Sequence, residues 1–106
     1  SFTLDVRDQA TEGLRTLQLG GSVNFDNAPA ICDQGRELLA PEGPCRVVVD
    51  VGGISAANSA LFSVLLRWMQ IAEARELRFS VRGISPRLMD VARVSGLETV
   101  IPLDIA

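Results

Sequence analysis

Hydrophobic residues along the chain follow two spacings, and each spacing predicts a different kind of element. Period-two alternation over Phe2–Val6 and Leu77–Val81 predicts half-buried strands, and the shorter alternation at Leu17–Leu19 marks a third. The unbroken β-branched run Val47–Val49 is typical of a strand buried on both faces. The chain therefore contains at least four predicted strands.

A spacing close to 3.6 residues accounts for most of the remaining apolar positions. We expect helices from about Asp26-Asn27 to Leu39, over Ser59–Ala74, and from Ser85-Pro86 to Val94. Each begins at a residue type that satisfies unpaired N–H groups at helix starts, and Gly96 is a typical stop for the third. The first two helices separate the later strands from one another, and the third follows the strand Leu77–Val81.

The resulting element order, β-β-α-β-α-β-α, predicts an α/β fold in one domain of 106 residues. We expect a mixed, mostly parallel sheet whose first strand is antiparallel to its neighbour, with helices packed against it. Gly20-Gly21 and Gly52-Gly53 are interpreted as turns that end their strands. The apolar tail Leu97–Leu103 is interpreted as a last strand or a turn.

The polar pair Asn58-Ser59 opens the second predicted helix, directly after the buried strand. Either residue fits a simple capping role, which contributes about 1 kcal/mol. The alternative is that the Ser59 hydroxyl and the free N–H groups at the helix start form a surface for a partner or for an added phosphate. Both interpretations stay open at this point.

The same helix has a full core-facing stripe, formed by Leu61, Val64, Leu65, Trp68, Met69 and Ala72. Phe62 and Leu66 fall outside this stripe, one turn apart and close to Ser59 and Ser63. Grouped apolar residues outside a core stripe predict a docking patch, unless a neighbouring element of the same domain covers them. The candidate partner-binding residues are Asn58, Ser59, Phe62, Ser63 and Leu66, with Ser59 as a possible phosphoacceptor.

Composition excludes several classes of function. The net charge is −3 and all ten basic residues are Arg, without a basic stripe, so we expect no nucleic-acid partner. No run of about 18 apolar residues is present, and the N-terminus lacks a basic signal-peptide region, so we expect no membrane insertion and a cytoplasmic location.

Candidate catalytic chemistry is equally sparse. The chain has no His, which removes the usual general base and the commonest metal ligand. Cys32 and Cys45 lack metal-ligand spacing and are interpreted as small core residues of a reducing compartment. We expect no enzymatic activity, no metal, no cofactor and no small-molecule substrate.

Three segments in register resemble the STAS domain family, the fold of anti-sigma factor antagonists. Leu19–Ala30 resembles the strand-to-helix entry of that family, Asp50–Leu66 its second strand-loop-helix landmark, and Ala92–Leu97 its third helix with a Gly stop. The resemblance covers nearly the whole chain and keeps the element order, so it implies a STAS fold.

The resemblance implies two functions. Gln34–Leu39, Leu65–Ala72 and Ala92–Leu97 are similar to the MlaB type, a cytoplasmic STAS subunit of an ABC phospholipid transporter that maintains outer-membrane lipid asymmetry. There the hydroxyl at the position of Ser59 contacts the ATPase subunit, which places the domain at the inner membrane. In anti-sigma factor antagonists, a kinase phosphorylates this hydroxyl within Asp-Ser-Ser-Gly, where this chain has Asn58–Leu61.

Overall fold

A five-stranded sheet forms the frame of the computed structural model, which describes residues 1–40 and 42–104. Within these residues the strands lie in sequence order: β1 (Phe2–Gln9), β2 (Leu14–Val23), β3 (Arg46–Ala57), β4 (Arg78–Arg82) and β5 (Leu103–Asp104). β1 is antiparallel to β2, and every later neighbouring pair is parallel. The predicted mixed sheet is confirmed, and the apolar tail leads into a short fifth strand.

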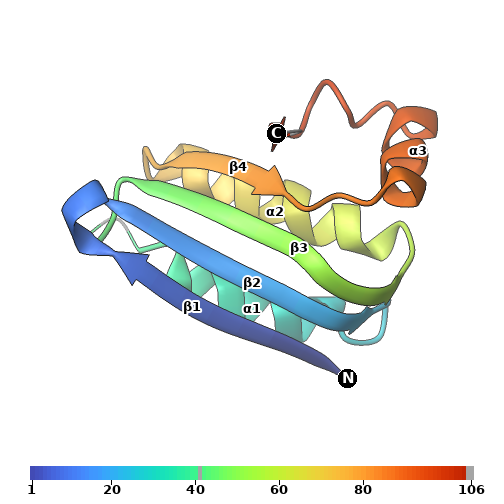
Figure 1. Ribbon diagram of the computed structural model, residues 1–106, viewed down its shortest axis with the longest axis horizontal. Coiled ribbons are helices and arrows are strands. Elements are labelled where there is room, and N and C mark those ends of the chain that lie inside the picture. The colour runs from blue at the N-terminus through green and yellow to red at the C-terminus, as the bar shows by residue number, and fades with distance from the viewer. Residues whose placement is uncertain (41, 105–106) are drawn as a thin grey trace.

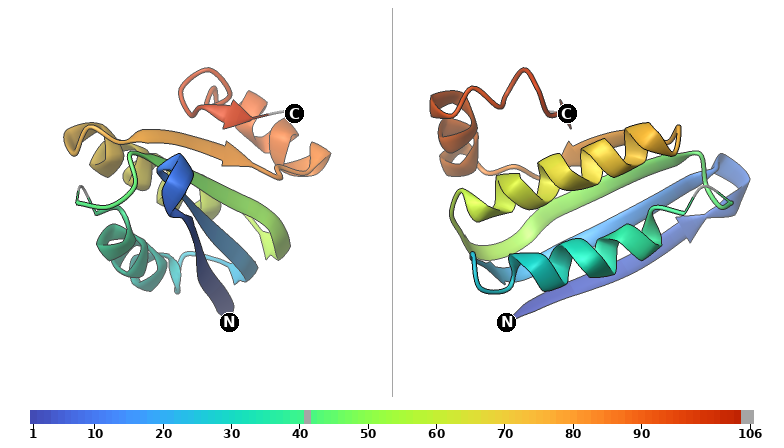
Figure 2. Two further views of the ribbon diagram at one scale, coloured as in Figure 1. Left: turned by 60° about the vertical axis from the view of Figure 1, so that its left-hand side comes forward. Right: turned by 180° about the vertical axis from the view of Figure 1, so that it is seen from behind.

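Two long helices, α1 (Ala28–Leu38) and α2 (Ala60–Ala74), cover the same face of the sheet (Figures 1 and 2). α3 (Pro86–Val94) lies beyond the end of β4, and the short helix η1 (Ala10–Glu12) joins β1 to β2. Among the described residues, no helix has the length and apolar character needed to cross a membrane. The opposite face of the sheet carries no described helix (Figure 1).

Both glycine pairs lie inside strands, so the prediction that they are turns is wrong. β2 continues past Gly20-Gly21 to Val23, and β3 continues past Gly52-Gly53 to Ala57. The parallel register between these strands shifts between Gln18 and Gly20, as it does at a β-bulge. A Cβ on Gly20 would lie 3.2 Å from the Gly53 carbonyl oxygen, so the close approach of the two backbones favours glycine there.

The helix layer is joined where α1 passes over the Trp68 side chain of α2. Gly35 sits directly against the indole, with no room for a Cβ. The fully buried indole donates a hydrogen bond from Nε1 to the Cys32 carbonyl oxygen at 3.2 Å. At the other end of the contact, Arg75 donates to the Arg36 and Leu39 carbonyl oxygens at 2.9 and 2.8 Å and satisfies the end of α1.

Replacing Gly35 by Ala tests this contact. The added methyl group has to displace the Trp68 ring or α1, so we expect Gly35→Ala to lower the free energy of unfolding by about 2 kcal/mol. Gly43→Ala is the matched control, because Gly43 is exposed and a methyl group added there would have its nearest neighbouring atoms at 3.9 Å or more. Its effect should stay within about 0.5 kcal/mol in urea denaturation. Equal effects of both variants would contradict the tight helix contact.

Candidate functional site

Three loops meet at one edge of the sheet. Residues 24–27, 58–59 and 83–85 follow the ends of β2, β3 and β4, and these three strands are parallel (Figure 1). Val23 at the end of β2 is in register with Ala57 at the end of β3, so the first two loops start side by side. The carboxyl edge of a parallel sheet is where such folds place their binding residues.

At the start of α2, Asn58 and Ser59 have different roles. The Asn58 side-chain oxygen accepts a hydrogen bond from the Ala60 N–H at 2.8 Å and so caps the helix. Ser59 already has helical backbone angles and its side chain makes no capping hydrogen bond. Its exposed hydroxyl is therefore available at the positive end of the α2 dipole.

Phe62 is buried, so its predicted place on a docking surface is wrong. Only 1% of the residue is accessible, and it belongs to the hydrophobic core. The buried arc of α2 is wider than the predicted stripe, because the helix packs against both the sheet and α1 and so contacts neighbours on more than one side. Ser63 is exposed and Leu66 is half-buried.

The exposed face of α2 is consequently polar. Ser59, Ser63, Arg67 and Gln70 follow one another at intervals of four, four and three residues, and all are exposed. Half-buried Leu66 borders this row. We call Asn58, Ser59, Ser63 and Leu66 the α2 surface: it retains four of the five predicted residues.

Phe25 is the site residue that the sequence did not single out. It is 63% exposed, on the loop between β2 and α1. Asn24 and Asn27 hold this loop: the Asn24 side chain accepts from the Asp26 and Asn27 N–H groups at 2.9 and 3.0 Å. The Asn27 side chain in turn donates to the Ser22 carbonyl oxygen at 2.8 Å. Asn24 and Asn27 could have indicated a turn around Phe25 from the sequence, since Asn side chains stabilise such turns.

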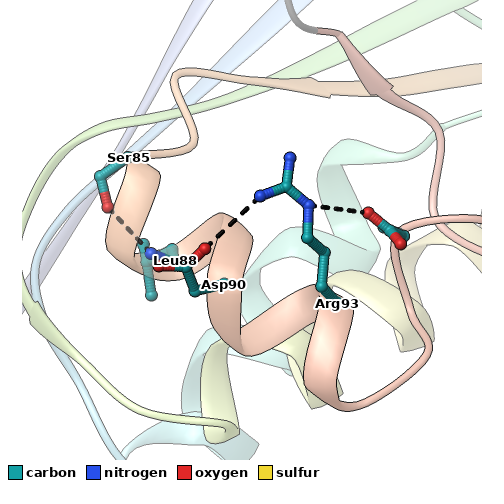
Figure 3. Close-up of polar contacts among 5 residues, drawn as sticks. Ser85, Leu88, Asp90 and Arg93 are labelled. Carbon is teal, nitrogen blue, oxygen red and sulfur yellow. Dashed lines mark hydrogen bonds and ion pairs between the residues drawn. The ribbon is translucent and has the colours of Figure 1, made fainter.

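α3 begins at the same edge of the sheet. The Ser85 hydroxyl accepts a hydrogen bond from the Leu88 N–H at 3.2 Å, which confirms the predicted cap (Figure 3). Arg93 bridges Asp90 and Glu98 at 3.4 and 3.1 Å, tying α3 to the segment that follows it (Figure 3). A shallow groove separates α3 from the end of β3, lined by Ile54, Ser55, Ala56, Ala57, Ser85, Arg87 and Leu88.

Neither cysteine belongs to the three loops at this edge. Cys32 is half-buried and burial raises the pKa of its thiol, which keeps the thiol protonated and poorly nucleophilic. Cys45 is exposed, so the prediction that it is a core residue is wrong; it lies just before β3, and its thiol is 3.7 Å from the Gly13 carbonyl oxygen. No group of three metal-ligating side chains occurs in the part of the chain that the structure describes.

A family model described as "Mlab, STAS domain" matches residues 6–103. No match was found among curated proteins. Solved structures include an anti-sigma factor antagonist from Mycobacterium paratuberculosis, which is 22% identical and superposes with a TM-score of 0.77 over 100% of this chain and 87% of that one.

Two further solved structures share the fold over nearly the whole chain. A variant of RsbS from Moorella thermoacetica is 12% identical, with a TM-score of 0.75 over 97% of this chain and 86% of that one. The Bacillus cell fate determinant SpoIIAA, in a phosphorylated form, is 18% identical, with a TM-score of 0.64 over 99% of this chain and 92% of that one. At these identities the similarity demonstrates a shared fold.

The division of roles between Asn58 and Ser59 can be measured. Asn58→Ala removes the acceptor of the Ala60 N–H, so we expect the free energy of unfolding to fall by about 1 kcal/mol. Ser59→Ala removes an exposed hydroxyl that makes no capping hydrogen bond, and its effect should stay within about 0.5 kcal/mol. Urea denaturation of both variants checks this. If Ser59→Ala lowered the free energy of unfolding more than Asn58→Ala, Ser59 and not Asn58 would be the capping residue.

Proposed function

The chain belongs to the STAS domain family. We propose that it is a non-enzymatic accessory subunit of an ABC-type phospholipid transport complex that maintains outer-membrane lipid asymmetry. The observation that carries this proposal is the match of residues 6–103 to a family model described as "Mlab, STAS domain". The absence of His and the poorly nucleophilic Cys32 thiol support a binding role over a catalytic one.

The proposed partner is the ATPase subunit of that complex. The α2 surface supplies exposed hydroxyl and amide groups and half-buried Leu66, while Phe25 supplies a large aromatic side chain at the same edge of the sheet. Buried aromatic side chains surrounded by polar groups dominate the binding energy of protein interfaces. Such a subunit would be cytoplasmic and held at the inner membrane through the complex alone.

A second candidate is a phosphorylation-controlled anti-sigma factor antagonist. It is favoured by the state of Ser59, which is exposed and whose side chain makes no capping hydrogen bond. Ser59 also lies at a helix start, where the helix dipole stabilises a phosphate group. A solved structure of the same fold is that of SpoIIAA in a phosphorylated form. The residues around Ser59 depart from the Asp-Ser-Ser-Gly pattern of the antagonists, so this candidate ranks second.

A bulky charge at the start of α2 separates the two candidates. We expect Ser59→Arg to abolish co-purification with the cognate ABC ATPase, because the new side chain occupies the proposed contact. Thr11→Arg is the matched control, since Thr11 is exposed in η1 at the opposite end of the sheet (Figure 1). Normal co-purification of Ser59→Arg would contradict the α2 surface, and stoichiometric phosphate on Ser59 after incubation with a cognate kinase would favour the antagonist.

Phe25→Ala probes the aromatic contribution. We expect binding to the ATPase to weaken by about tenfold, equivalent to about 1.4 kcal/mol, because the ring is the large apolar side chain exposed on this loop. The thermal midpoint of the isolated domain should be unchanged, since the ring contributes little to the core. Calorimetric titration against the ATPase measures the change, and an unaltered affinity would exclude Phe25 from the interface.

A further inference from the structure

β1 presents a long unpaired edge. Among the described residues this strand pairs with β2 alone, over its full length from Phe2 to Gln9, and it forms the margin of the sheet (Figure 1). Unpaired N–H and C=O groups along such an edge are a template for another strand. The residues of β1 determine which strand this edge can accept.

The backbone groups of the edge can be assigned from the ladder. The Ser22 N–H donates to the Ser1 carbonyl oxygen at 2.9 Å, which makes Ser1 and Ser22 a hydrogen-bonded pair. Hydrogen-bonded and non-hydrogen-bonded pairs alternate in an antiparallel ladder, and the β1–β2 register is unbroken. The N–H and C=O groups of Leu4, Val6 and Asp8 therefore point away from β2, toward the open edge.

We propose that two copies of this chain pair through their β1 edges, antiparallel and centred on Val6, to form one continuous sheet. In this register Val6 faces Val6 of the second copy in a hydrogen-bonded pair, and Leu4 faces Asp8. Asp5 then stands opposite Arg7 of the second copy in a non-hydrogen-bonded pair, where side chains approach most closely. Symmetry produces this ion pair twice.

The charges on β1 select this register. Asp5 and Arg7 are exposed, and neither forms an ion pair with any described residue. Asp8 forms an ion pair with Arg15 at 2.7 Å, and the hydrogen bond from Arg15 lowers the pKa of the Asp8 carboxyl group. Asp8 is therefore charged, and its charge is already paired within its own chain. Centring the pair on Asp5 or on Arg7 would place like charges opposite each other, which is unfavourable.

The exposure of Val6 favours the same register, centred on this residue. It is one of the large hydrophobic residues that remain exposed, with 42% of its surface accessible, and pairing on itself would bury that surface in both copies. The contact uses none of the residues of the α2 surface, and it stands whether or not the proposed function is correct.

Charge reversal tests the register. We expect the wild-type chain to self-associate between micromolar and millimolar concentration in sedimentation equilibrium. Asp5→Arg and Arg7→Asp should each weaken the dimer at least tenfold by creating like-charge pairs, and the double variant Asp5→Arg/Arg7→Asp should restore it. Asp26→Arg, an exposed charge reversal away from β1, is the control and should leave the dimer unchanged. A monomer at all concentrations, or a double variant as weak as the single ones, would overturn the proposal.

A second variant tests the backbone pairing. Val6→Pro removes the outward N–H but no hydrogen bond to β2, and proline is tolerated on edge strands. We expect loss of the dimer with an unchanged far-ultraviolet circular dichroism spectrum, whereas Val6→Thr, which keeps the N–H, should still dimerise. If Val6→Pro does not fold, the charge-reversal series decides alone. A folded Val6→Pro dimer of wild-type strength would refute edge pairing.

Discussion

The contact between Trp68 and Gly35 is the constraint on which the helix layer depends. A large indole occupies the space where α1 and α2 approach, and α1 comes close enough to hydrogen-bond it only because residue 35 has no side chain. Arg75 holds the end of α1 from the same helix that carries Trp68. The two helices are thereby joined at two places along their length, and both cover the same face of the sheet (Figure 2).

This arrangement determines where binding groups can appear. With one face of the sheet beneath α1 and α2, the start of α2 and the loop before α1 emerge together at the carboxyl edge of the parallel strands. Asn58 satisfies the helix start, which leaves the neighbouring Ser59 hydroxyl without a structural task. A hydroxyl that the fold does not use is available for recognition or modification, and both proposed functions rely on it.

The sequence predicted the elements, the mixed sheet and the core stripe of α2, because hydrophobic periodicity directly reflects burial. It misplaced Phe62 because periodicity on one helix cannot reveal how many neighbours surround that helix. It misassigned Gly20-Gly21 and Gly52-Gly53 because glycine is equally suited to a turn and to a bulge where two strands approach closely. Exposure of Phe25 depends on side-chain hydrogen bonds within its loop, which hydropathy does not encode.

The asparagine-braced loop around Phe25 has a thermodynamic consequence. Association usually loses free energy through ordering of mobile segments, about 0.5–1.5 kcal/mol for each immobilised flexible side chain, with a further cost for loop backbone. Here the Asn24 and Asn27 hydrogen bonds already fix the backbone in the free protein, and an aromatic ring has only two torsions to restrict. The loop is preorganised, so a partner that buries Phe25 retains most of the gain from that apolar surface as affinity.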